Sequence, residues 1–119
     1  MWLRLGQPYT TDRPQVALGQ DHTLALDSDT RTVYAWGKCS EGQLGVSDNA
    51  FLRPPCVSPA LSAPAHGAAA VTALHAAGDC SAAVHEQAAP PVRSVVYVGK
   101  GCRELEQALR SALNFAKLN

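Results

Sequence analysis

Short apolar runs alternate with glycines and polar turns along most of the chain. The first three runs, 15–18, 22–26 and 32–36, have the length of strands, and the polar segment 27–31 is typical of a turn between antiparallel strands. The second half repeats this layout, and we expect strands at 71–75, 81–84 and 92–98 with a turn over 85–91. The pattern therefore predicts a mainly β fold built from two similar sets of short strands.

The end of the chain follows the period of a helix. Apolar residues recur there at steps of three and four, at Leu105, Ala108, Leu109, Ala112, Leu113 and Ala116. This spacing predicts an amphipathic helix over 103–118 whose apolar stripe needs cover. The cover comes either from the chain's own strands, which we favour because almost no linker precedes the helix, or from another chain. The candidate partner-binding residues are Leu105, Leu109 and Leu113.

The two sets of strands resemble one unit written twice. Thr23–Leu26 matches Ser81–Val84, and Val33-Tyr34 matches Val96-Tyr97, 63 positions later. A period of about sixty residues with three or four strands per unit is typical of a propeller blade. The proline-rich residues 46–70 are expected to form a long loop.

One stretch is more specific than the rest. It runs Gly19-Gln20-Asp21-His22-Thr23, then Val33-Tyr34-Ala35-Trp36-Gly37, then Gly42-Gln43-Leu44-Gly45. This resembles the regulator of chromosome condensation repeat, strongly over 19–57 and weakly over the rest of 1–102. The resemblance implies a structural repeat motif made of Gly19, His22, Tyr34, Trp36, Gly37, Gly42, Gln43, Leu44 and Gly45.

The fold class expected is mainly β: a partial propeller of about two antiparallel blades that ends in one C-terminal α-helix. Propellers of the resembled family have seven blades, so this chain is an excerpt of a longer protein or a remnant that a partner completes. The expected divisions are a blade remnant and first strand at 1–18, a blade with the strong motif at 19–70, a degenerate blade at 71–102, and the helix at 103–119.

The motif residues have physical roles that can be stated in advance. Tyr34 and Trp36 alternate on one strand, so both side chains project to the same face, and we expect Trp36 to be buried between blades. His22 follows a glycine turn, where its ring is expected to bond to a backbone carbonyl of the adjacent blade. The motif glycines are expected at sharp turns and close approaches.

Composition excludes several classes of function. The 119 residues carry ten Lys and Arg against ten Asp and Glu, and a net charge of zero argues against general nucleic-acid binding. No run of eighteen apolar residues exists to span a membrane. The four cysteines lack metal-site or disulfide-framework spacing, so we expect four reduced thiols, no metal, and an intracellular location.

These observations favour a non-catalytic protein-interaction or scaffold module without catalytic residues or a cofactor. Its expected partners are other protein chains that complete or cover the propeller. The resemblance also implies an alternative, part of a guanine-nucleotide exchange factor for a small GTPase or a chromatin-binding propeller. Gly99-Lys100-Gly101 before the helix is expected to be a plain turn, because the spacing of a phosphate loop is missing.

Overall fold

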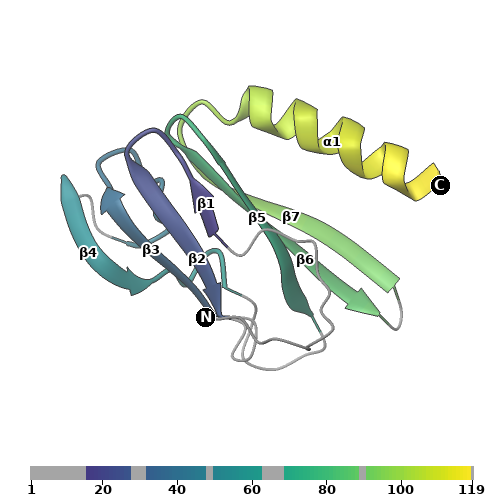
Figure 1. Ribbon diagram of the computed structural model, residues 1–119, viewed down its shortest axis with the longest axis horizontal. Helices are drawn as coiled ribbons and strands as arrows, with labels where there is room; N and C mark the ends of the chain where they lie inside the picture. The colour runs from purple at the N-terminus through teal and green to yellow at the C-terminus, as the bar shows by residue number, and fades with distance from the viewer. Residues whose placement is uncertain (1–15, 28–31, 48–49, 63–68, 89–90, 119) are drawn as a thin grey trace, which may run out of the picture.

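The computed structural model describes residues 16–27, 32–47, 50–62, 69–88 and 91–118, with side chains through residue 112 except that of Ala88. Over these ranges the chain forms seven strands and one helix (Figure 1). Their bounds are β1 Val16–Leu18, β2 His22–Asp27, β3 Thr32–Lys38, β4 Leu52–Val57, β5 Ala70–Ala77, β6 Cys80–Ala88, β7 Pro91–Gly99 and α1 Arg103–Leu118. The predicted mainly β fold with one C-terminal helix is confirmed.

The first sheet has the strand order β1-β2-β3-β4, and every pair is antiparallel. The expectation of a long loop over 46–70 is wrong for β4, which pairs with β3 from Tyr34↔Val57 to Lys38↔Leu52. β4 contains Pro54 and Pro55, and it lies at the edge of the sheet. Proline is tolerated in an edge strand, because a neighbouring strand on one side does not need its missing N–H. Prolines therefore gave a misleading loop signal here.

The second sheet has the order β5-β6-β7, again antiparallel throughout. The turn expected over 85–91 is shorter than predicted, because the β6–β7 ladder continues from Cys80↔Gly99 to Ala88↔Pro91. The three predicted strands are present, and each is longer than its apolar run.

The core lies between the two sheets, where β1 and β2 pack against β5. Leu24, Val33 and Ala35 project from the first sheet and meet Leu74 and Ala83 of the second. Side chains from the segments between strands complete the same cluster, namely Cys39, Leu44 and Leu61. All of these are at most 1% exposed, so the two sheets share one hydrophobic core.

The sheets are structural repeats of each other. His22 pairs with Gly37 in the first sheet, and Cys80 pairs with Gly99 in the second. The backbone closes in the same way in both, because Lys38 N–H donates to the Asp21 carbonyl at 2.8 Å and Lys100 N–H donates to the Asp79 carbonyl at 3.0 Å. This register makes Tyr34 equivalent to Val96, so the repeat of the second hairpin strand is 62 residues rather than the 63 expected from sequence.

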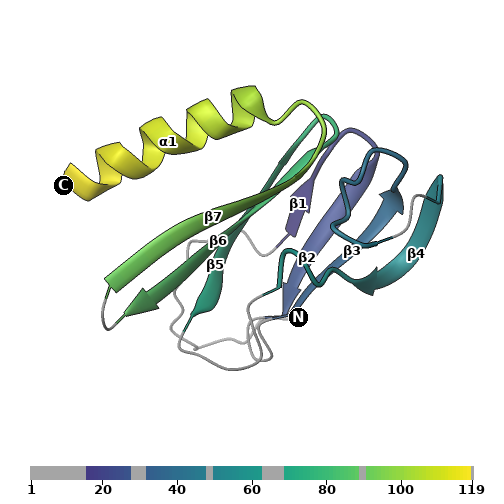
Figure 2. The same ribbon diagram turned by 180° about the vertical axis from the view of Figure 1, so that it is seen from behind.

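Helix α1 covers the range predicted from its period and lies beside the second sheet, on the side away from the first (Figures 1 and 2). A disulfide joins Cys102, just before α1, to Cys80 at the start of β6. The expectation of four reduced thiols is wrong for this pair, since the cysteines lie 22 positions apart in sequence and only folding brings them together. Neither Cys39 nor Cys56 is part of a disulfide.

Candidate functional site

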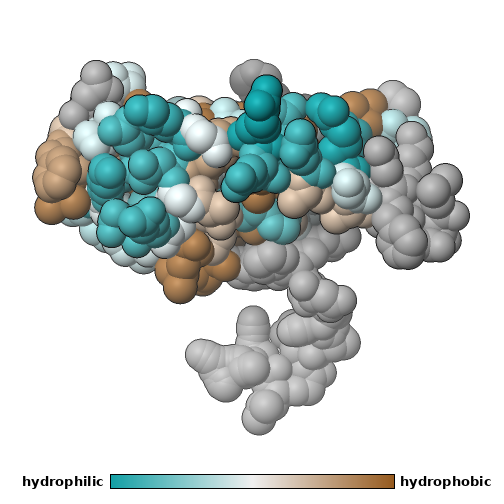
Figure 3. All heavy atoms as spheres, turned by 90° about the horizontal axis from the view of Figure 1, so that it is seen from above, coloured by the Kyte–Doolittle hydropathy of each residue, from teal (hydrophilic) through white to brown (hydrophobic). Residues whose placement is uncertain are grey.

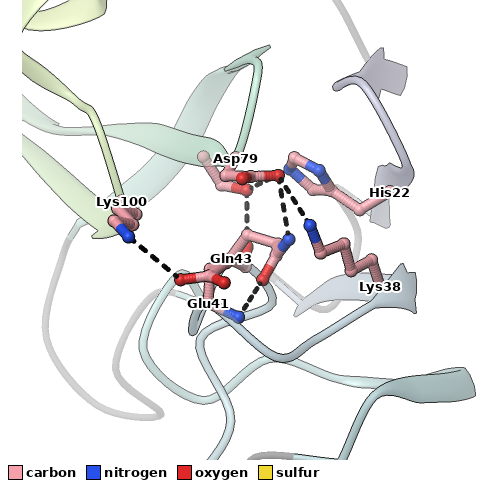
Figure 4. A network of polar contacts seen from close by, with 7 residues as sticks. His22, Lys38, Glu41, Gln43, Asp79 and Lys100 are labelled. Carbon is pink, nitrogen blue, oxygen red and sulfur yellow. Dashed lines mark hydrogen bonds and ion pairs between the residues drawn. The ribbon is translucent and has the colours of Figure 1, made fainter.

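The repeat motif places a polar network at the junction of the two sheets (Figure 4). The His22 ring, at the start of β2, has its Nε2 atom 2.7 Å from the Ser81 hydroxyl on β6. That hydroxyl donates its proton to the Gln43 backbone carbonyl at 2.6 Å. The prediction that His22 bonds to a backbone carbonyl of the adjacent blade is therefore wrong, because its partner there is a side-chain hydroxyl.

These two contacts define the tautomer of His22. Ser81 has one hydroxyl proton and gives it to a carbonyl that can only accept, so Nε2 of His22 must carry a proton and donate. Nδ1 is then the unprotonated nitrogen, and it is buried without a partner among the described residues. Burial lowers the pKa of His22, and the nearby carboxylates of Asp79 and Asp21 only partly oppose this, so the ring is neutral at pH 7.

Asp79 connects the two sheets from the turn that precedes β6. Its carboxylate accepts a bond from the Gln43 side-chain amide at 3.3 Å and pairs with the Lys38 ammonium at 3.7 Å. A second cross-sheet pair joins Lys100 and Glu41 at 3.8 Å. Both ion pairs are partly solvated, so each contributes little to stability, and both join residues of the first sheet's half to residues of the second (Figure 4).

Sequence reasoning did not select Asp79 and Ser81, although a signal for both existed. Asp21-His22-Thr23 and Asp79-Cys80-Ser81 occupy the same place in the two repeats, as the shared β-ladder register shows. The repetition of an aspartate followed two residues later by a hydroxyl residue could have identified them.

The remaining motif residues lie on both sides of this junction. Gln43 and Leu44 are fully buried. Gly37 needs its positive φ of 106°, and a Cβ there would lie 2.5 Å from the Asp21 carbonyl oxygen. Gly19 is required for another reason, since a Cβ at this position would overlap the His22 ring. Gly42 and Gly45 also have positive φ.

Tyr34 and Trp36 share one face of the first sheet, as predicted, but this face points away from the second sheet. Ladder partners place five apolar side chains together on it, and we call this set the open face: Val16, Leu18, Tyr34, Trp36 and Val57. Leu18 is 69% exposed and Val16 is 56% exposed. Trp36 is half-buried, so the expectation that it is buried between blades is wrong for this chain.

The open face corresponds to a surface that is covered in the second sheet. Thr23 and Ala25 lie on β2, the strand at the centre of this face. They are equivalent to Ser81 and Ala83, which are fully buried against the first sheet. In the second sheet this surface therefore packs on a neighbouring sheet, and in the first sheet the same surface has no such cover among the described residues.

Helix α1 lies at the other end of the repeat from the open face, next to the face of the second sheet that points away from the first. Cys80 is equivalent to His22, and the face that it shares with Ala82 and Val84 is at most 2% exposed. Where His22 bonds to Ser81 of the next sheet, Cys80 bonds to Cys102 at the start of α1. The helix thus stands where a further sheet would follow. Leu109 is 6% exposed, Leu105 is half-buried, and the side chain of Leu113 lies outside the described residues.

No group of His, Cys, Asp and Glu side chains in the described ranges is arranged to hold a metal ion. No helix in the described part of the chain is long and apolar enough to cross a membrane. Gly99 ends β7, and Lys100 and Gly101 lie in the short connection to α1.

A protein-family model matches part of the first sheet. Residues 15–43 match the model of the Regulator of chromosome condensation (RCC1) repeat. The match spans β1, β2 and β3 together with the turn that carries Gln43, and these elements supply the first sheet's side of the polar junction. Over residues 15–43 the chain is thus similar to a regulator of chromosome condensation repeat, and the described residues form two antiparallel sheets that repeat each other's register.

Proposed function

We propose that this chain is a non-catalytic protein-interaction module whose open face docks against an apolar β-sheet face of another protein chain. The observation that carries this proposal is the equivalence of the two sheets. The surface of the second sheet that corresponds to the open face is buried against a neighbouring sheet, which supports a sheet face of the same kind as the partner surface.

The composition of the open face supports a protein partner. Tyr34 and Val57, which are 37% and 47% exposed, add to the more exposed Val16 and Leu18. Trp and Tyr are enriched where protein surfaces meet, because they bury a large apolar area with few rotatable bonds. A contiguous apolar sheet face of this kind marks an interaction site more often than a solvated surface.

The rim of the open face specifies one polar feature of the partner. Asp21 is equivalent to Asp79, which receives Gln43 and Lys38 of the neighbouring sheet. Asp21 is exposed, and the shared register gives it the place in the first sheet that Asp79 has in the second. A partner that packs as the second sheet's neighbour does would place a cation or an amide there.

Site-specific cross-linking tests this proposal. A photoreactive amino acid is placed at Leu18 of the chain in its native cells, and in a matched control at Gln107, which is exposed on α1. We expect a defined protein to cross-link from position 18 and not from position 107. The purified partner should bind the unmodified chain, and Leu18→Asp should weaken that binding at least about tenfold, because a carboxylate would be buried in an apolar contact.

A different cross-linking pattern would contradict the proposal. Equal cross-linking from both positions would mean that the open face has no preferred partner. Unchanged affinity of the Leu18→Asp variant for the purified partner would show that the partner binds elsewhere.

A further inference from the structure

A second surface, separate from the open face, lies on the other side of the molecule. A groove of about 590 Å³ runs between β7 and α1. Its lining includes Glu86 and Gln87 of β6 and five successive residues of β7, from Pro91 to Val95. Successive residues of a strand project to both faces of a sheet, so the groove reaches the edge of β7 as well as the face beside α1. Glu106 and Arg110 of α1 form the opposite wall. The volume is within the range of about 300–1,000 Å³ that ligand sites occupy.

The edge of β7 is suited to accept another strand. β7 is the last strand of its sheet and pairs with β6 alone among the described residues. Residues 91–94 are exposed. An edge strand presents a row of backbone N–H and C=O groups that an extended peptide can satisfy. Pro91 lacks an N–H, so such pairing has its full set of donors only from Val92 onward.

The charges in the groove are already matched within the chain. Arg93 pairs with Glu86 at 2.9 Å, and Arg110 pairs with Glu106 at 3.1 Å. Two cations and two carboxylates leave the lining without net charge. A charged occupant would have to compete with these pairs, whereas an uncharged one meets Val92, Val95 and Tyr97 without disturbing them.

From this geometry we propose that the groove binds an extended, uncharged peptide segment of a partner protein, which adds as a strand to the edge of β7 and places apolar side chains between β7 and α1. Backbone hydrogen bonds along the edge would hold the peptide. The apolar floor and the paired charges would select its side chains. This site does not share residues with the open face.

The test uses the full chain and a phage-displayed library of random nine-residue peptides as the probe. We expect enriched peptides to lack charge and to carry apolar residues at alternate positions. Binding of a synthetic enriched peptide should slow amide hydrogen exchange in β7. It should proceed equally well in the Leu18→Asp variant, which separates this site from the open face.

Backbone methylation makes the test specific for strand addition. Only alternate amides of an added strand point toward its neighbour. N-methylation of one alternate set should weaken binding at least about tenfold, because several hydrogen bonds are lost, and methylation of the other set should change it little. Equal sensitivity of the two sets, or no enriched peptide at all, would overturn the proposal.

A charge variant tests the selectivity. Glu106→Gln leaves Arg110 without its carboxylate, and both side chains are substantially exposed, so the fold should persist. Selection on this variant should enrich acidic peptides, with a gain of about two- to fivefold over the parent chain. Glu104→Gln, on the same helix but outside the groove, is the control. Unchanged preference in Glu106→Gln, or β7 amides already protected in a dimer of the chain alone, would contradict a peptide site.

Discussion

Two glycines of the repeat motif both have a positive φ angle, but only one of them also lacks space for a side chain. Gly37 and Gly42 both have positive φ, at 106° and 80°. A side chain at Gly42 would enter open space, whereas at Gly37 it would meet the carbonyl of Asp21. At residue scale the motif therefore combines turn chemistry with close approach between strands.

The two positions predict different costs for the same substitution. Gly42→Ala should lower the free energy of unfolding by about 1 kcal/mol, since only the backbone conformation is penalised. Gly37→Ala should cost at least about twice as much, because the backbone of Asp21 must also move. Urea denaturation of both variants measures this, and equal losses would show that the close approach at Gly37 is unimportant.

His22 predicts a pH dependence of stability. Burial holds the pKa of this ring below its ordinary value of 6.5, so the unfolded chain binds the proton more readily. The stability contributed by neutral His22 is fully present above pH 6.5 and is lost as the pH falls through the folded pKa. The free energy of unfolding should therefore decrease between pH about 7.5 and about 5.5.

Variants isolate the contribution of this ring. His22→Gln should be less stable at neutral pH and should show a smaller decrease on acidification. Burial also lowers the pKa of His75, so His75 adds to the decrease with the same sign, and His75→Gln is the matched comparison. If His22→Gln kept the full pH dependence of the parent chain, His22 would not be its source.

At the scale of elements, the two sheets are joined to their next neighbour in different ways. The first sheet reaches the second through His22, Gln43 and Lys38, and the second sheet reaches α1 through a covalent bond at the place equivalent to His22. The expected intracellular location rested on four reduced thiols, and the Cys80–Cys102 disulfide does not support it. The helix is attached where a noncovalent contact would otherwise continue the series.

The disulfide predicts a local and a global effect. Cys80→Ser with Cys102→Ser should lower the free energy of unfolding by about 2–4 kcal/mol and should speed amide exchange in α1 more than in β2 or β3. Thiol titration of the unfolded parent chain should find Cys39 and Cys56 alone. Four reactive thiols in the carefully isolated chain, or unchanged exchange in α1, would contradict this account.

At the scale of the whole molecule, the described residues form two sheets with one shared core, one side closed by α1 and one side open. Figure 3 shows further hydrophobic residues at the end where β4 lies in Figure 1, and there Phe51 and Leu52 are 67% and 62% exposed. Repeat arrays bury their faces against neighbours, so an uncovered apolar face favours association. The nucleotide-exchange and chromatin-binding alternatives remain predictions from the resemblance alone.

The open face predicts self-association of the purified chain in the absence of its partner. Analytical ultracentrifugation should show oligomers that increase with protein concentration. Leu18→Asp should shift the chain toward monomer, because a charge would have to be buried in the contact. Ala108 was expected on the covered stripe of α1 but is exposed, so Ala108→Asp adds the same charge there and should leave the oligomers unchanged. A parent chain that stays monomeric at all concentrations would contradict this prediction.

Much of the fold was determined by local sequence patterns. The 3.6-residue period gave α1 at its observed bounds, and short apolar runs located six strands, because both signals depend only on neighbouring residues. The motif from Gly19 to Gly45 led to the repeat that residues 15–43 match. β4 was missed, because Pro54 and Pro55 are compatible with an edge strand only when the sheet around them is known.

Contacts between residues far apart in sequence could be found only from the tertiary structure. The pairing of Cys80 with Cys102 and of His22 with Ser81 depends on how the strands and the helix are brought together. Alternation along β3 placed Tyr34 and Trp36 on one face but could not say which face the second sheet would cover, because a period of two is the same on both sides of a strand. That choice depends on the packing of the whole core, and it leaves the open face uncovered by the second sheet.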